Sequence, residues 1–355
     1  MTDSLLRRLR PSQVREVITV LIIIGIVLFF STQIDNYLTG RTFNRVSTEF
    51  PIIAVVAVGQ LLVVLTRNLD LSVGSQVALV AWSTGYIATQ VNDINPVVLV
   101  ILGMGMGVIM GGINGLIVAF GRVPAIITTL ATLAIYRSVL ITMANAQTIE
   151  TRGLPEWIVN FPGTTLFEFG RADIRLIFII ALIVVAVVQL MLAYLPYGRR
   201  LYAIGSNPDA AAMVGLPKQR DVFLAYLGCG ALAGLGGFMQ MAKFGTITVD
   251  SARGLEMAVI AAVVVGGANI FGGSGSAIGV MLGAVLISVL DLSLARWIGI
   301  SDFTRDFLLG LLILLAVAGD VVINKRLQKV WMRARRRDEA RAGPPAGAPA
   351  GGPDG

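Results

Sequence analysis

The stretch YGRRLYAIGSNPDAAAMVGLPKQRD, residues 197–221, is a polar segment between two apolar runs at residues 174–195 and 222–242. Each run is long enough to cross a bilayer, because about 20 mostly apolar residues span its hydrocarbon core. The order of apolar run, polar segment and apolar run therefore predicts a membrane protein whose chain leaves the bilayer here and enters it again.

Within this 197–221 loop, the residues from Asn207 onward predict a short helix. Asn207 is a favourable N-cap, and the fixed φ of Pro208 suits the first helical turn. Residues 209–213 continue the helix, and Gly215 with the proline two positions later ends it. We expect this helix to lie outside the membrane and to contact a soluble partner. Four basic residues flank it: Arg199, Arg200, Lys218 and Arg220.

The composition excludes several classes of function. Hydrophobic residues make up 55% of the 355 residues and charged residues 14%, with a mean hydropathy of +0.80. Lipid is therefore the solvent for most of the chain. The chain has no histidine and one cysteine, Cys229, which excludes histidine-ligated metal sites, a histidine general base and an internal disulfide. We expect no metal, no cofactor and no enzymatic activity, and we attribute the net charge of +7 to membrane orientation rather than to nucleic-acid binding.

Apolar stretches along the chain predict an all-α polytopic membrane protein with about ten transmembrane helices. They lie at roughly 16–34, 50–66, 71–90, 96–120, 123–143, 174–195, 222–242, 256–271, 276–296 and 304–323. The first follows a basic arm, residues 1–15, and lacks a small-residue cleavage site, so we interpret it as a retained helix. The transmembrane domain thus covers residues 16–325, and residues 326–355 form a basic and then disordered tail.

Lysine and arginine are distributed unequally between the two sides of this topology. With the N-terminus in the cytoplasm, 18 of the 28 fall in cytoplasmic segments and nine in external loops and helix ends, with Arg137 inside a span. The positive-inside rule then predicts that both termini are cytoplasmic, which requires an even number of crossings; eight or twelve satisfy the charges equally well. The longest external loop, residues 144–173, is either a docking surface with an amphipathic helix or a simple connection.

Glycines are frequent within the spans and indicate close packing between helices. Gly107 and Gly111 in the fourth span correspond to Gly279 and Gly283 in the ninth if the ten spans divide into two halves of five. Since five is odd, such halves would be inverted relative to each other, as in many transporters. The glycine-rich segment 266–275 lacks the lysine of a phosphate-binding loop and predicts a tight turn.

Polar and ionisable residues at membrane depth are candidates for a translocation pathway, because burying them in lipid is costly. We assign this role to Asn68, Asp70, Asn114, Glu256 and Asn269. Asp70 has the alternative of capping the next span, and Glu256 that of complementing a helix N-terminus. Arg137 either pairs with a carboxylate such as Asp291 or extends to the interface.

Three stretches resemble the permease subunits of ribose-type ATP-binding-cassette sugar importers. They are NLDLSVGS at 68–75, GRVPAIITTL at 121–130, and the block from Tyr197 to AVIAAVVVGGANIFGGSGS at 258–276. The resemblance covers residues 50–325. Within the loop, Asp209, Ala210 and Ala211 followed by Gly215 are similar to the element by which importer permeases dock on their ATPase, with aspartate replacing glutamate; Asn207 caps the same helix.

The resemblance implies an importer in the inner membrane, with 197–221 as a cytoplasmic coupling loop and 144–173 as a periplasmic loop. It implies a dimer with a second permease copy or paralogue, a cytoplasmic ATPase and a periplasmic binding protein that delivers a monosaccharide. The cargo alternatives are an autoinducer-2-like furanose, a nucleoside or a branched-chain amino acid. An ion-coupled secondary transporter and an intramembrane enzyme are the remaining alternatives, the latter disfavoured by the absence of histidine and paired carboxylates.

Overall fold

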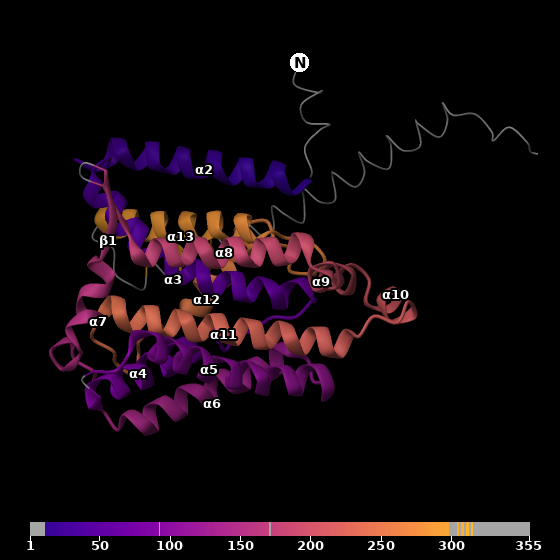
Figure 1. The fold of residues 1–355 in the computed structure, drawn as a ribbon. Helices are drawn as coiled ribbons and strands as arrows, with labels where there is room; N and C mark the ends of the chain where they lie inside the picture. Colours follow the sequence, from indigo (N-terminus) through magenta and orange to yellow (C-terminus); the bar gives the residue numbers. More distant parts are fainter. Residues whose placement is uncertain are drawn as a thin grey trace, which may run out of the picture.

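The computed structural model describes residues 11–91, 93–169 and 172–297, and six further positions between 304 and 314. Within this part the chain is mostly helical, and its long helices run roughly side by side along one axis (Figure 1). The helices of the first half are α2 (Pro11–Gln33), α3 (Gly40–Leu65), α4 (Val73–Gln90), α5 (Pro96–Gly115) with the π-turn η1 (Leu116–Phe120), and α6 (Ala125–Ala144). Those of the second half are α8 (Leu176–Tyr194), α9 (Pro196–Ser206), α10 (Pro208–Met213), α11 (Lys218–Phe244), α12 (Leu255–Val265) and α13 (Ala277–Trp297).

Seven of the described helices are long and apolar enough to cross a membrane: α2 from Arg15, α3, α5 with η1, α6, α8, α11 and α13. The predicted count of ten exceeds this number for two reasons. Helix α4, which matches the predicted stretch 71–90, is not among the seven, and α12 has only 11 residues. In addition, the basic arm before Pro11, most of the predicted span 304–323 and the tail 326–355 lie outside the described residues.

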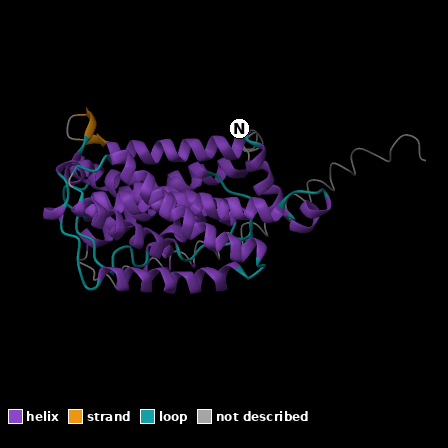
Figure 2. Ribbon diagram, turned by 60° about the horizontal axis from the view of Figure 1, so that its bottom comes forward, coloured by secondary structure: helices purple, strands orange, loops and turns teal. Residues whose placement is uncertain are grey.

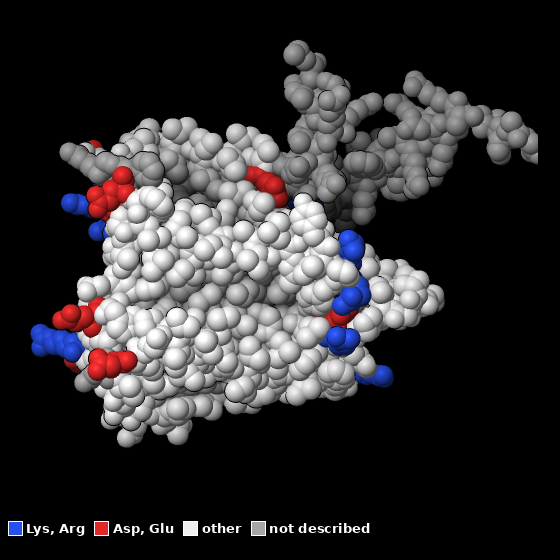
Figure 3. Space-filling model, viewed as in Figure 1, with Lys and Arg blue, Asp and Glu red and all other residues white. Residues whose placement is uncertain are grey.

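Charged side chains lie at the two ends of the long axis, and the face in Figure 3 shows a broad uncharged band between them. Helix α10 projects from one end (Figure 1), and the 144–173 segment lies at the other. An uncharged band between two charged ends is the surface expected of a protein that spans a bilayer.

Helices α3, α4 and α11 form the centre of the molecule. In an 18-residue apolar stretch of α3, 94% of the residues are buried, whereas in the apolar stretch of α2 only 11% are buried. Helix α11 packs on α3, α4 and α5, while α3 packs on α11, α12 and α13. The predicted glycine packing is present in the α5–α11 contact, where a Cβ on Gly107 would overlap the Gly230 carbonyl oxygen and a Cβ on Gly234 would overlap that of Gly103.

The 144–173 segment differs from the all-α prediction because it holds a small β-hairpin at one end of the helices (Figure 2). Strand β1 (Thr165–Phe169) pairs antiparallel with β2 (Ala172–Arg175). Aromatic and β-branched residues around a glycine favour such a hairpin over an amphipathic helix, which was one of the two alternatives for this loop. The helical part is limited to α7 (Glu156–Asn160) and two 3-10 turns, η2 (Thr151–Gly153) and η3 (Phe161–Gly163).

Two non-helical segments interrupt the helical bundle. Residues 66–72, the first break, separate α3 from α4, and residues 245–254, the second break, separate α11 from α12. The first turns of the two following helices meet: a Cβ on Gly74 would overlap the Glu256 carboxylate and would lie 3.2 Å from the Ala252 carbonyl oxygen. The N-terminal turns of α4 and α12, which follow the two breaks, thus contact each other inside the bundle.

Candidate coupling helix and polar core

Helix α10 has the residues and caps that the sequence predicts. The Asn207 side-chain oxygen accepts hydrogen bonds from the backbone N–H groups of Asp209 and Ala210, at 3.1 and 3.0 Å. At the other end, Gly215 has a φ of +76° and donates to the Ala212 carbonyl. Leu216 donates to the Ala211 carbonyl at 3.0 Å, which completes a Schellman cap. A helix of six residues is thus held at both ends by its own caps.

Most of α10 faces solvent. Among the residues predicted to form the docking element, Asp209, Ala210 and Gly215 are exposed, and Ala211 is buried. Met213 and Val214 at the tip are 87% and 75% exposed, which the sequence analysis did not single out. Two adjacent exposed apolar side chains on a projecting helix are typical of a surface that a partner covers.

Helix α9 connects α10 to the bundle and is fixed at both of its ends. At its start, Arg200 forms a two-pronged ion pair with the buried Asp221 of α11, at 2.6 and 3.1 Å. The hydrogen bond that Arg200 donates to the Asp221 carboxylate raises the pKa of Arg200, and burial raises the pKa of Tyr197. At its end, the Arg67 side chain donates to the carbonyls of Gly205 and Ser206 at 2.6 and 2.8 Å. Arg67 belongs to the first break.

The first break contains a sealed polar cluster around Asp70. Asp70 is fully buried and accepts hydrogen bonds from the Ser72 backbone N–H at 2.9 Å and from the Ser72 hydroxyl at 2.6 Å. The side-chain amides of Gln76 and Asn114 also donate to it, at 3.1 and 3.2 Å. Asn114 in turn donates to the Ser72 hydroxyl, and its side-chain oxygen accepts from Tyr136. The Asp70 cluster therefore joins the first break to α4, α5 and α6.

The structure brings together two of the five residues that we assigned to the pathway, Asp70 and Asn114. Asn68 donates back to Thr66 in its own turn, and the Asn269 side chain accepts from the Phe271 N–H at 3.0 Å. Glu256 lies in the first turn of α12, against Gly74. Within the described residues, no hydrogen bond joins these three residues to Asp70. Residues 266–275 form the predicted turn, with four glycines at positive φ.

The second break is held by hydrogen bonds that its own backbone carbonyls accept, and not by hydrogen bonds to a buried carboxylate. The Arg137 guanidinium of α6 donates to the carbonyls of Val249 and Ser251, at 2.7 and 3.0 Å. This geometry replaces the two alternatives proposed for Arg137, because the non-helical segment offers free carbonyls within its reach. Ile247 also pairs with Ile149 in an isolated antiparallel bridge. The 144–173 end of the molecule therefore braces the second break.

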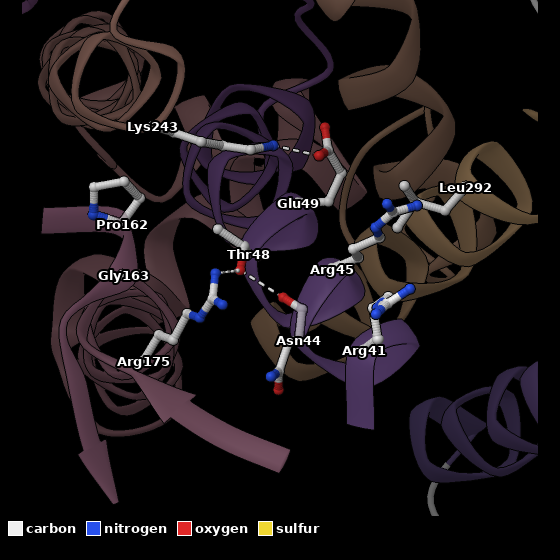
Figure 4. A pocket seen from close by; sticks show the side chains of 10 residues that line it. All are labelled: Arg41, Asn44, Arg45, Thr48, Glu49, Pro162, Gly163, Arg175, Lys243 and Leu292. Carbon is white, nitrogen blue, oxygen red and sulfur yellow. Dashed lines mark hydrogen bonds and ion pairs between the residues drawn. The ribbon is translucent and has the colours of Figure 1, made fainter. Parts of the chain in front are cut away.

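A basic cavity of about 930 Å³ lies beside the β-hairpin (Figure 4), at the end of the molecule opposite α10 (Figure 1). Helix α3 supplies Arg41, Arg45 and Glu49, β2 supplies Arg175, and α11 supplies Lys243. Lys243 forms an ion pair with Glu49. Sequence analysis counted these cations only as topology signals, because their convergence depends on contacts between segments far apart in the chain.

Comparison with known proteins gives the family. The family described as "Branched-chain amino acid transport system / permease component" matches residues 42–317. The chain belongs to this permease family. The probable ABC transporter permease protein y4mJ of Sinorhizobium fredii is 30% identical to this permease over 302 residues, which cover 84% of this chain and 86% of that protein.

Two further relatives are named autoinducer 2 import system permease protein LsrC. That of Yersinia enterocolitica is 32% identical over 314 residues, covering 88% of this chain and 83% of its own. That of Salmonella typhi is 31% identical over 325 residues, covering 92% and 90%. No solved structure matches. The permease is a multi-pass protein of the plasma membrane and the transport component of an ABC-type system.

Proposed function

We propose that this permease is the membrane subunit of an ATP-driven importer for a sugar-like solute, with α10 as its docking helix for a separate cytoplasmic ATPase. The exposed tip of α10, with Met213 and Val214 on a doubly capped helix, is the observation that carries this proposal. An amphipathic or apolar helix tip commonly inserts into a groove of its partner. Asp209, Ala210 and Gly215 would line the contact, and the buried Ala211 would seat the helix on α9.

The contacts of α9 support a route by which a movement of α10 reaches the bundle. A Cβ on Gly205 would overlap the Leu65 carbonyl oxygen and the Gly273 N–H group, so α9 ends between the last residue of α3, where the first break begins, and the 266–275 turn. Tyr202 donates to the Gly275 carbonyl at 2.8 Å, and Gly273 donates to the Leu65 carbonyl at 3.1 Å. Because these contacts leave little space, a displacement of α9 would shift both segments together.

The two breaks would then form the switch that changes access. Discontinuous helices at the interface of inverted repeats are a common basis of transport pathways. The paired contacts support an inverted repeat, since α3 and α11 occupy equivalent positions: α11 contacts α4 and α5 where α3 contacts α12 and α13. Glu256 and Gly74, where the two first turns meet, would lie on the pathway, and the Asp70 cluster would fix one of its walls.

The names of the relatives and of the family bear on the cargo that we propose for this chain. The LsrC relatives are named for autoinducer 2 import, and the family description names branched-chain amino acids. A monosaccharide or a related furanose is the solute that we propose. A periplasmic binding protein would deliver it, and a second permease copy or paralogue would complete the pathway.

Copurification tests the docking role of α10. The permease would be coexpressed with a tagged ATPase subunit from the same transport system, using wild type, Met213→Asp and Met213→Leu. We expect Met213→Asp to reduce ATPase recovery at least tenfold, because a charge replaces an apolar contact, and Met213→Leu to retain it. Gly215→Val should reduce recovery as well, because a β-branched residue is strained at a φ of +76°. Full recovery with both Met213→Asp and Gly215→Val would reject this docking site.

Accessibility labelling provides an independent test of orientation. A cysteine at Ala212, in a Cys229→Ser background, should react with an impermeant maleimide only after the cytoplasmic side is opened. Labelling from the outer side of intact cells would reject the proposal. Uptake that continues without the ATPase and follows an ion gradient would indicate a secondary transporter instead.

A further inference from the structure

The basic cavity at the hairpin end has more cationic groups than the described residues neutralise. It is lined by three arginines and a lysine against one carboxylate, Glu49, which leaves a formal charge of +3. Lys243 uses Glu49 as its ion-pair partner. Arg41 and Arg45 have no hydrogen bond or ion pair to any described residue. Such a concentration of positive charge in a concave site attracts anions and raises their local concentration.

Among the arginines of the cavity, Arg175 is held in place by hydrogen bonds, whereas Arg41 and Arg45 are exposed side chains. Its Nη1 donates to the Thr48 hydroxyl at 3.1 Å, and Thr48 donates to the Asn44 carbonyl at 2.5 Å. This chain of contacts holds the guanidinium against α3, as Figure 4 shows. The Arg175 Nε is buried and has no hydrogen-bond partner. A positioned guanidinium with a free donor suits an oxyanion, which binds arginine through two parallel hydrogen bonds.

Two further carboxylates of the described residues, Asp173 and Asp291, lie close to the cavity but outside its lining. Asp173 accepts a hydrogen bond from the Asn44 side chain at 2.9 Å and is not part of the lining. Asp291 lines a second, smaller cavity of about 200 Å³, which shares Glu49 with the basic cavity. Gln240 and the first residues of α12 also line this second cavity. A carboxylate accepts hydrogen bonds from hydroxyls, and a side-chain amide both accepts from them and donates to them. The smaller cavity therefore suits a hydroxylated group.

We infer that the two adjoining cavities form a binding site for a hydroxylated solute that carries an oxyanion, such as a sugar acid or a sugar phosphate. The oxyanion would bind Arg175 with Arg41 and Arg45, and the hydroxyls would lie toward Glu49 and Gln240. This inference rests on the proposed import function and narrows its cargo class. The site lies on the end opposite α10, where an importer would receive its solute.

Binding to the full-length permease in lipid nanodiscs tests the inference, with D-glucuronate, D-glucose 6-phosphate, D-glucose and inorganic phosphate as probes in calorimetric titrations. We expect the two charged sugars to bind at least tenfold more tightly than glucose and more tightly than phosphate. Raising the salt to 0.5 M should weaken their binding, because screening reduces the attraction. Glucose that binds as tightly as the charged sugars, or phosphate that matches glucose 6-phosphate, would overturn the inference.

Variants connect the binding to the cavity. The double variant Arg41→Ala/Arg45→Ala removes exposed side chains without described partners, so the fold should be retained, and we expect at least a fivefold loss of affinity for glucuronate. Arg175→Lys keeps the charge but loses the two-pronged geometry, and should also weaken binding. Arg152→Ala, an exposed arginine in η2 outside the cavity, is the matched control and should bind as wild type. Unchanged affinity in the double variant would reject the site.

The same preparations separate this inference from the import proposal. If the ATPase copurifies and depends on α10 while no charged sugar is preferred, only the anionic cargo is rejected. If the preference is present but the ATPase neither copurifies nor responds to changes in α10, the anion site stands and the import mechanism fails.

Discussion

The two breaks in the bundle differ in how their polar groups are hydrogen-bonded. Both expose backbone and polar groups inside a mostly apolar bundle, where an unsatisfied hydrogen-bonding group is costly. The first break surrounds the buried Asp70 with side-chain donors from several helices. The second relies on Arg137 and a backbone bridge, and its own ion pair, Asp250 with Arg253, is largely exposed, at 67% and 73%. The first break is therefore a sealed joint, and the second is an accessible one.

This difference indicates where movement is easiest. Opening the first break requires several buried hydrogen bonds to be lost together, whereas the second break has part of its surface already in contact with solvent. Segments with few buried contacts open at lower free energy than sealed ones. We infer that the second break changes conformation during transport and that the first transmits force from α9.

The largest expected effect comes from removing the carboxylate of the first break. Asp70→Ala leaves the donors of Ser72, Gln76 and Asn114 without their acceptor, and the cost should be on the order of 3 kcal/mol of folding stability. Thermal unfolding of the detergent-solubilised permease measures this loss. Asp250→Ala in the second break is the matched control, with an expected change of at most about 0.5 kcal/mol for an exposed pair. Equal losses in the two variants would remove the distinction between the breaks.

The second largest effect concerns Arg137, which holds the second break through two carbonyls. Arg137→Met keeps an apolar stem but removes both hydrogen bonds, at a cost of about 1–3 kcal/mol. We expect the 245–254 segment to become more accessible, measured as faster maleimide labelling of Ser251→Cys in a Cys229→Ser background. Arg137→Lys keeps one donor and should label at an intermediate rate. No change in the labelling rate for Arg137→Met would show that the bridge between Ile149 and Ile247 is sufficient.

Sequence reasoning predicted the parts of this fold that depend on local pattern. The Asn207 cap, the 266–275 turn and the close packing of glycine-rich helices each arise from residues close in sequence or from the absence of a side chain; that α5 and α11 are the helices that meet was not predicted. Hydrophobic runs also located most of the long helices to within a few residues, since lipid requires a minimum apolar length. The exception is α3, which begins at Gly40, ten residues before its predicted span 50–66.

What remained unpredicted depends on contacts between distant segments. Asp70 and Asn114 are 44 positions apart, and nothing in either local pattern indicates that α4 and α5 align them. The partners of Arg137 are backbone carbonyls, which a search for complementary charges does not consider. The basic cavity joins α3, β2 and α11, and the hairpin that contributes Arg175 lies where the sequence predicted an external loop and the start of the next span. The apolar pattern of the sequence therefore does not tell which residues of different helices lie side by side.

A third prediction tests whether force enters through the first break. A Cβ on Gly205 would overlap the Leu65 carbonyl oxygen, so Gly205→Ala requires the end of α9 to move away from the last residue of α3, where the first break begins. We expect ATPase binding to persist, because α10 is untouched, while uptake per ATP hydrolysed falls about tenfold. Gly105→Ala in α5 is the control, since no atom lies within 4 Å of its added methyl group. A coupling ratio equal to wild type in Gly205→Ala would place the transmission elsewhere.

The smallest effect should come from Glu256, where the two interrupted helices meet. Its carboxylate lies in the first turn of α12 and against the first turn of α4, so it complements the positive ends of both helix dipoles. Glu256→Gln keeps the shape and removes the charge, and should cost about 0.5–1 kcal/mol in thermal unfolding. Glu256→Asp, which keeps the charge on a shorter side chain, is the control. Because Glu256 lies in the first turn of α12, directly after the accessible second break, its neutralisation should lower uptake strongly while it changes stability only slightly. If uptake falls only as much as the amount of folded protein falls, Glu256 has a structural role like that of Asp70.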